Sequence, residues 1–265
     1  NLFYEQRYSS TTLYDKVDFV KVAEAMGANK TNAILEFLGN KLEKQINVEQ
    51  TMYAILSNYP TQLTTAKVSL DINSVGGPKV AKKIVLLSEI GQTDIYRAVT
   101  NNKGIMNGVD SVLVATGNDY RGVEAATAVW ANKDGSYTSL SKWSIANDRL
   151  IGTVTIPLAI GVVGGSIKAR QDIQQSFNLL GKVSAEQLAE IIAATGLANN
   201  FSALLAISTK GIQAGHMKLQ ARNLVATLKA NEDEKAKVLE KLQESKQYTQ
   251  EAAVRFLDEI RREKN

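Results

Sequence analysis

Apolar residues recur at helical spacing near the beginning of the chain. The pattern predicts a helix over residues 15–44 that is interrupted near Gly27. Beyond that glycine, the positions that share one helical face are Ile34, Leu35, Phe37, Leu38 and Leu42. Polar residues separate them, so this helix is expected to bury one side only.

The last third of the chain is helical throughout by the same criterion. The spacing predicts helices over 173–180, 185–195, 197–210, 216–228 and 233–264. Gly181 stands where a helix is expected to stop. Ser184 and Gln187 have the spacing of a capping box, which indicates that the next helix begins there.

The middle of the chain contains shorter patterns that are typical of strands. Residues 53–56 form a short apolar run closed by a turn over 57–60, and residues 67–72 alternate apolar and polar side chains. β-Branched, alternating residues over 136–143 and 149–156 predict a hairpin. The apolar, glycine-rich segment 157–166 is expected to pack closely against another backbone.

Between these strands, Gly76-Gly77-Pro78 predicts a loop, and residues 80–90 predict a helix. Two glycine-bearing segments follow, over 100–110 and 115–122, and the first is expected to be a loop. Together the patterns predict an α+β protein, dominated by helices, with a short mixed sheet.

Composition places the chain among ordinary globular proteins. Of its 265 residues, 44% are hydrophobic and 22% are charged. Its 31 basic and 27 acidic residues give a net charge of +4, and they mix along the C-terminal helices, which indicates a solvated face and no nucleic-acid partner. The apolar run 158–163 is too short to span a bilayer, so no membrane association is expected.

The absence of cysteine excludes disulfides, thiol nucleophiles and cysteine-ligated metals. The start of the chain has no signal-peptide pattern, and a cytoplasmic location is expected. One histidine and the spacing of the carboxylates match no metal site.

Three residues are candidates for catalysis. His216, the single histidine, lies between glycines and suits proton transfer near neutral pH, although it also suits a helix start with no chemical role. Lys103 lies among amides and glycines, where a lysine can hold a carbonyl oxygen or remain a solvated turn residue. Asp119 is either a helix cap or a carboxylate set beside a lysine.

Two glycine-containing segments are candidates for ligand approach. Small residues interrupt the predicted helix in Glu24-Ala-Met-Gly-Ala-Asn29, and such residues let phosphates come close to a helix start. Gly161-Val-Val-Gly-Gly165 is compatible with close packing or with ligand approach. Neither segment is the three-glycine dinucleotide fingerprint.

In combination and order, these segments resemble the class II hydroxymethylglutaryl-CoA reductases. Residues 24–29 resemble the Asp-Ala-Met-Gly-Ala-Asn cofactor motif of that family. Tyr96-Arg-Ala98 with Asn102-Lys-Gly-Ile-Met-Asn-Gly108 resembles the segment that carries its catalytic lysine. Gly117-Asn-Asp-Tyr-Arg121 resembles the segment of its catalytic aspartate, and Gly211-Ile-Gln-Ala-Gly-His-Met217 that of its catalytic histidine. Val163-Gly-Gly165 is a less specific match.

The resemblance implies a two-step reduction of hydroxymethylglutaryl-CoA to mevalonate and CoA by two NADPH or NADH. It assigns catalysis to Lys103, Asp119 and His216, substrate binding to Arg97 and Asn107, and cofactor binding to five residues. These five are Glu24, Met26, Gly27, Ala28 and Asn29.

The resemblance also implies a homodimer with its active site at the interface. The expected organisation is the second half of a small ferredoxin-like cofactor-binding domain over 1–57, a helix-rich large domain over 58–210 and a C-terminal helical flap over 211–265.

Two departures from the family pattern stand out. The cofactor motif opens with Glu24 where the family has aspartate. The family also uses a glutamate well upstream of this motif, and nothing here matches it, so the N-terminal part is expected to be missing. The alternative is a truncated, non-catalytic relative that dimerises and binds nucleotide or CoA.

Overall fold

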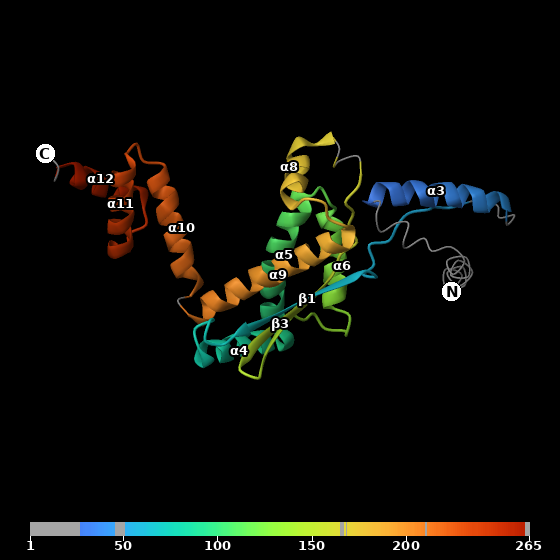
Figure 1. Ribbon diagram of the computed structural model, residues 1–265, viewed down its shortest axis with the longest axis horizontal. Helices are drawn as coiled ribbons and strands as arrows, with labels where there is room; N and C mark the ends of the chain where they lie inside the picture. Colours follow the sequence, from blue (N-terminus) through green and yellow to red (C-terminus); the bar gives the residue numbers. More distant parts are fainter. Residues whose placement is uncertain (1–26, 46–50, 165–166, 168, 210, 263–265) are drawn as a thin grey trace. The chain divides into compact units, whose positions relative to one another are not determined.

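The computed structural model describes residues 27–45, 51–164, 167, 169–209 and 211–262. It divides into two compact units, residues 1–202 and 203–265, which are described separately below. The division expected after residues 57 and 210 remains a prediction. Within the described residues the fold is α+β and rich in helix, with one small sheet, as the sequence predicts (Figure 1).

The sheet of the first unit has three antiparallel strands in the order β1-β3-β2. The prediction of a mixed sheet is therefore wrong for the described residues, in which both strand pairs are antiparallel. They are β1 (Leu63–Asp71), β2 (Ser141–Ala146) and β3 (Arg149–Pro157). Asn147 and Asp148 both have positive φ, 51° and 55°, which suits the tight turn between β2 and β3. The predicted hairpin is confirmed, but its first strand begins at Ser141, because residues 138–140 bond to a helix instead.

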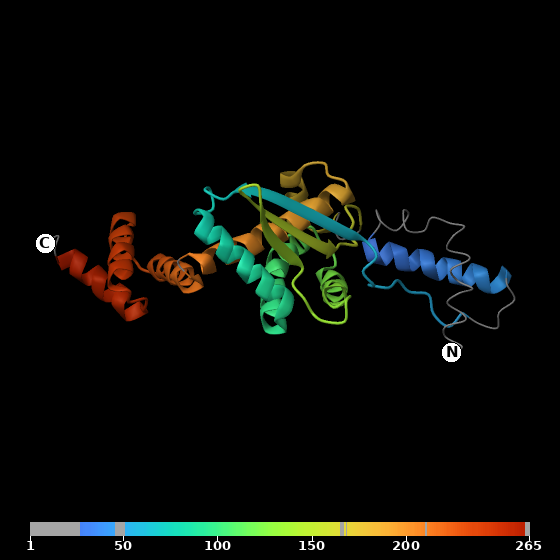
Figure 2. The same cartoon turned by 90° about the horizontal axis from the view of Figure 1, so that it is seen from below.

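The central strand β3 alternates buried and half-buried residues, as its sequence pattern predicts. Gly152 of β3 pairs with Trp143 of β2, and a Cβ at Gly152 would lie 2.5 Å from the indole ring. The glycine therefore provides the space in which the buried Trp143 ring lies across the sheet. β1 is at the other side of the sheet, and its outer edge has no strand partner among the described residues (Figure 2).

Three consecutive helices follow β1 or connect it to the hairpin. They are α4 (Pro78–Thr93), α5 (Ile95–Ala115) and α6 (Tyr120–Ala131). Gly77 precedes α4 with φ 89°, and Pro78 occupies the first turn, where its missing N–H costs nothing. Asp94 caps α5 by accepting a hydrogen bond from the Tyr96 N–H.

The loop expected over residues 100–110 is wrong, because this segment lies in the middle of α5. One of its two glycines, Gly108, serves close helix packing rather than a turn. A Cβ at Gly108 would lie 2.9 Å from the Thr195 carbonyl oxygen of α9 (Ala185–Ser208). The two helices thus approach more closely than a side chain would permit.

Helix α9 is continuous, and the predicted separation into 185–195 and 197–210 is wrong. Gly196 faces α5, where an added Cβ would lie 2.9 Å from Val109 Cγ2. α9 is long and apolar enough to cross a membrane by length and composition, a property that core helices share. Its first-unit part buries Leu188, Ile192 and Leu197, which fits the core-helix explanation.

The helix boundary signals before α9 are confirmed. α8 (Gln171–Leu180) ends at Gly181, which has φ 77°. Ser184 Oγ accepts from the Gln187 N–H, and Gln187 Oε1 accepts from the Ser184 N–H. This reciprocal pair is the predicted capping box.

The helix predicted at the beginning of the chain is described from Gly27 onward as α3 (Gly27–Gln45). The strand predicted over 53–56 is wrong. That segment instead bonds to α3, because the Leu56 N–H donates to Asn32 Oδ1 and the Thr51 N–H to Glu43. No strand partner for it exists within the described residues.

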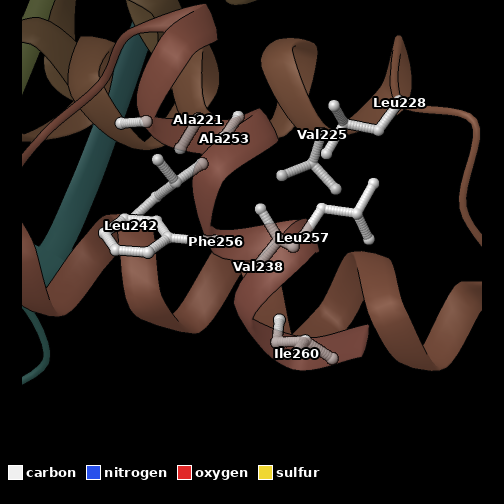
Figure 3. Packing of buried hydrophobic residues seen from close by; sticks show 10 residues of the cluster. Ala221, Val225, Leu228, Val238, Leu242, Ala253, Phe256, Leu257 and Ile260 are labelled. Carbon is white, nitrogen blue, oxygen red and sulfur yellow. The ribbon is translucent and has the colours of Figure 1, made fainter. Parts of the chain in front are cut away.

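The second unit contains the end of α9 and three further helices with a core of their own. These helices are α10 (Ile212–Ala226), α11 (Glu232–Ser245) and α12 (Gln250–Arg262). Figure 3 shows Leu242, Phe256 and Leu257 within this core. The single helix predicted over 233–264 is wrong, because the backbone turns at Lys246, where φ is 54°.

Candidate active site

Of the candidate site residues on α5, Lys103 and Asn107 lie on its exposed side, and Arg97 is half-buried. Lys103 and Asn107 are exposed and one turn apart, and Arg97 lies at the edge of the same side. The Arg97 Nε is buried and has no hydrogen-bond partner among the described residues. Neither Arg97 nor Lys103 forms an ion pair within this part of the chain, so two cations remain available to an anionic ligand.

The opposite side of α5 is buried and explains why this sequence forms a helix. The buried positions are Ala98, Asn101, Asn102, Ile105, Met106, Gly108, Val109 and Leu113. They recur every three or four residues and face the sheet hairpin and α9. The residues between them are left for the exposed side, which is how Lys103 comes to face solvent from the middle of a helix.

Two of these buried positions are asparagines whose importance the sequence analysis missed. Asn101 and Asn102 are 6% and 2% exposed, and both side chains form hydrogen bonds to segment 138–141. Asn200 of α9 is 1% exposed and donates to Asn101. Asparagine within an otherwise apolar helix face is the signal that points to such a network.

Asp119 is the N-cap of α6, which confirms the plainer of its two sequence interpretations. Its Oδ1 accepts from the Gly122 N–H at 3.0 Å. Its other interpretation, a carboxylate set beside a lysine, stays a prediction, and Lys103 of the same chain does not lie next to it. Lys103 lies 12 residues before the end of α5, so at 1.5 Å per residue the two positions are roughly 18 Å apart along the axis.

The turn between α5 and α6 is fixed by short-range contacts. Gly117 has φ 68°, and a side chain there would collide with Ile173. Asn118 donates to Thr116 Oγ1 and accepts from the Gly161 N–H at 2.8 Å. Through Asn118 the turn holds the start of segment 161–165. A Cβ at Gly164 would meet nothing within 4 Å, so the close packing expected of this glycine-rich stretch is not seen at that residue.

A pair of carboxyl groups connects α5 and α6. Burial, together with a hydrogen bond and charge repulsion from Glu124, raises the pKa of Asp110 to about 7. Asp110 Oδ1 is buried without a partner. Two carboxylates this close cannot both be ionised without cost, and Asp110 therefore holds a proton below neutral pH.

The remaining predicted site residues are described only in part. His216 lies in α10, and its side chain is outside the description, as are those of Gly27, Ala28 and Asn29 at the beginning of α3. Glu24 and Met26 lie outside the described residues altogether. Among the residues that the structure does describe, no cluster of three His, Asp or Glu side chains is suited to a metal ion.

A sequence profile covers most of the chain and decides its family. The profile for hydroxymethylglutaryl-coenzyme A reductase matches residues 8–221, which include the lysine, aspartate and histidine motifs. The chain belongs to the hydroxymethylglutaryl-coenzyme A reductase family. The resemblance of the ordered motifs is thereby confirmed.

Relatives of the reductase family are found in both sequence and structure comparisons. The 3-hydroxy-3-methylglutaryl-coenzyme A reductase of Archaeoglobus fulgidus is 40% identical over 223 residues, which are 83% of this chain and 51% of that protein. The probable reductase of Borreliella burgdorferi is 36% identical over 255 residues, 92% of this chain and 59% of that protein.

Solved reductases of Streptococcus pneumoniae have the same fold. One superposes with a TM-score of 0.65 at 42% identity, and the match covers 90% of this chain and 58% of the chain of that reductase. The class II reductase bound to NADPH in open conformations has a TM-score of 0.65 at 43% identity. This match covers 90% of this chain and 59% of the chain of that reductase. The chain thus spans between half and three fifths of the length of these relatives.

Proposed function

We propose that the protein reduces 3-hydroxy-3-methylglutaryl-CoA to mevalonate and CoA with NADPH or NADH, within the mevalonate route to isoprenoids. Family membership supports this activity, and the observation that carries it is the exposed face of α5. Lys103 on this face and the half-buried Arg97 at its edge are cations without a carboxylate partner among the described residues. Such a face suits a substrate that carries a carboxylate and develops negative charge on oxygen.

Two nicotinamide cofactors, bound in turn, would each supply one hydride, the first to the thioester carbon and the second to the aldehyde that remains after CoA leaves. Lys103 holds the carbonyl oxygen and stabilises the negative charge that forms on it in both steps. His216 donates a proton to the departing CoA thiolate, which leaves as the thiol. Arg97 and Asn107 hold the substrate along α5.

The cofactor segment is assigned to residues 24–29. Gly27 and Ala28 open the described part of α3. Residues with little or no side chain at this place let a phosphate approach the backbone N–H groups. The residues present thus fit an anionic cofactor, and Glu24, Met26 and Asn29 complete the proposed segment.

The separation of Lys103 from Asp119 supports a homodimeric active site. A lysine side chain is too short to cross roughly 18 Å. Two copies of α5 that cross in antiparallel fashion near Ser111, midway between residues 103 and 119, bring Lys103 of one copy toward Asp119 of its partner. In such a site Asp119 orients the lysine from across the interface.

The remaining architecture follows the family in this proposal. Residues 1–57 form the second half of a ferredoxin-like cofactor domain, residues 58–210 the large domain and residues 211–265 a helical flap that excludes water. Helices α10, α11 and α12 share a hydrophobic core, which supports a flap that keeps its structure as it moves. A cytoplasmic location is part of this proposal.

NADPH oxidation by the full-length natural protein in the presence of hydroxymethylglutaryl-CoA tests the proposal. We expect CoA release and mevalonate formation at two NADPH per substrate. Binding of NADPH or CoA without turnover would contradict the proposal and favour the non-catalytic alternative.

A further inference from the structure

The turn of α5 that precedes Lys103 is fixed to the rest of the first unit by a buried chain of hydrogen bonds. Asn101, two residues before the lysine, is 6% exposed. Its Nδ2 donates to Ser139 Oγ at 2.5 Å and to Ser141 Oγ at 3.2 Å. These serines lie where the chain enters β2, so one side chain connects the helix to the sheet.

Donors and acceptors in this hydrogen-bond network can be assigned in only one way, because the indole N–H of Trp143 at one end can only donate. Trp143 Nε1 donates to Asn200 Oδ1 at 2.8 Å. The Asn200 amide must then present its Nδ2 to Asn101, and it donates to Asn101 Oδ1 at 2.9 Å. This leaves Asn101 Nδ2 for the serine hydroxyls. Every amide in the series is therefore oriented by its neighbour.

The same turn is held at two further points. The Asn102 side chain bonds to the Thr138 carbonyl and the Leu140 N–H, both within 2.9 Å. On the α9 side, Asn199 Nδ2 donates to the Gly104 carbonyl. Residues 101–104 thus have contacts to α9 and to segment 138–141 that set the rotation of α5 about its axis. The direction in which Lys103 leaves the helix follows from that rotation.

We propose that Asn101 is a positioning residue of the reductase site, which fixes the orientation of Lys103 through its bonds to Ser139, Ser141 and Asn200. The proposal rests on the proposed function, in which Lys103 holds the reacting oxygen. Asn101 does not touch the substrate, since it lies on the buried side of α5. A displacement of about 1 Å at a catalytic group is enough to lower a rate about 100-fold.

Asn101→Leu, which keeps the side-chain size and removes its hydrogen bonds, tests this in the full-length protein. We expect kcat to fall on the order of 10- to 100-fold, with the KM for NADPH unchanged within about twofold. The Trp143 fluorescence should shift as well, because Asn200 loses its partner. The matched control is Ile84→Ala, a cavity in the buried face of α4. It should lower thermal stability without lowering kcat per folded molecule.

A milder variant covers the case in which Asn101→Leu does not fold. Ser139→Ala removes one acceptor of the Asn101 amide and should lower kcat in the same direction by a smaller factor. A kcat per folded molecule equal to that of the Ile84→Ala control in both variants would overturn the proposal.

Hydrogen exchange separates failure of this proposal from failure of the proposed function. Amides of residues 101–107 should exchange at least about tenfold faster in Asn101→Leu than in a control of equal stability. Exchange and Trp143 fluorescence need no turnover. If the natural enzyme shows no reduction, the proposed function fails, whereas unchanged exchange and fluorescence would overturn the role of Asn101 on their own.

Discussion

Lys103 illustrates how a single residue is made available for chemistry by the burial of its neighbours. Asn101, Asn102, Ile105 and Met106 on either side of it are buried, and Lys103 alone in this stretch is fully on the exposed side. The sequence motif singled out this residue as a candidate but assigned it to a loop, whereas it lies in α5. A helix holds the lysine more firmly than a loop, and firm placement is what stabilisation of a transition-state charge requires.

We expect Lys103→Ala to lower kcat/KM for hydroxymethylglutaryl-CoA by at least about 1,000-fold while leaving the fold intact, since the cation is lost from an exposed position. Steady-state NADPH oxidation and circular dichroism measure the two effects. Lys79→Ala, an exposed lysine in the first turn of α4, is the matched control and should keep normal turnover. Near-normal turnover of Lys103→Ala would remove the lysine from the mechanism.

Asp110 predicts a dependence of stability on pH. Its pKa is raised to about 7 by burial and by Glu124, against an ordinary value of 3.8. The native state therefore holds a proton that the unfolded state has released, and this contribution to stability is lost as the pH rises from about 4 through about 7. Asp110→Asn keeps the neutral form at all pH values.

The melting temperature of Asp110→Asn should exceed that of the natural protein at pH 8, and the difference should shrink toward pH 5. Thermal unfolding at both pH values measures this. In a Glu124→Gln background the gain at pH 8 should be smaller, because the repelling partner is gone. A gain that does not vary with pH would show that charge is not its cause.

Among the elements, the crossing of α5 and α9 depends on two glycines that the sequence suggested were loop or break residues. Gly108 faces the Thr195 carbonyl and Gly196 faces Val109. Neither glycine has positive φ, so both are there for lack of a side chain rather than for backbone freedom. From the sequence alone each glycine is only a residue with low helix propensity, since the segment whose close approach requires a glycine is about 90 residues away.

Gly108→Ala should lower the free energy of unfolding by about 1–3 kcal/mol, because its Cβ would lie 2.9 Å from backbone that cannot easily move. Gly104→Ala is the matched control in the same helix, where a Cβ meets nothing within 4 Å. The control should gain about 0.5–1 kcal/mol from its better helix propensity. Urea unfolding of both variants measures the difference, and equal effects would argue against the close crossing.

Features that depend on neighbouring residues could be predicted from the sequence, whereas features that depend on distant segments could not. Local signals were sufficient for β3, whose residues alternate, and for the ends of helices at Gly181 and Ser184. They failed for Tyr53–Leu56, since an apolar run forms a strand only where another strand pairs with it. They also failed at Lys246, because lysine has no preference for the left-handed conformation that it adopts there.

In the candidate site, too, the contacts between distant segments could not be predicted from the sequence. Motifs located Lys103 and Asp119 but suggested a contact between them, which the length of α5 prevents within one chain. The buried network around Asn101 was not predicted, because its partners come from β2 and α9. Spacing along a sequence cannot show which distant segments meet.

At the scale of the whole molecule, the proposed dimer makes a distinct prediction. Lys103→Ala and Asp119→Asn should each be inactive alone. When the two variants are mixed after dissociation, a hybrid dimer contains one site with both changes and one site with neither. Random assortment then restores about a quarter of the natural activity.

The mixed activity is measured after re-association, with each variant taken through the same treatment alone as the control. Activity that remains at the level of the single variants would mean that both residues serve a site within one chain. That result would also contradict the antiparallel crossing of α5 near Ser111.

The outer edge of β1 has a practical consequence for work with this protein. Along Leu63–Asp71, the backbone N–H and C=O groups that point away from β3 are covered by no described strand. An uncovered edge of this length is a template for pairing with the same strand of another molecule, which leads to aggregation. Lys67 lies on this strand with Val68 and Leu70 beside it. A second lysine at exposed Thr65 should therefore improve the solubility of recombinant fragments more than any change to their core.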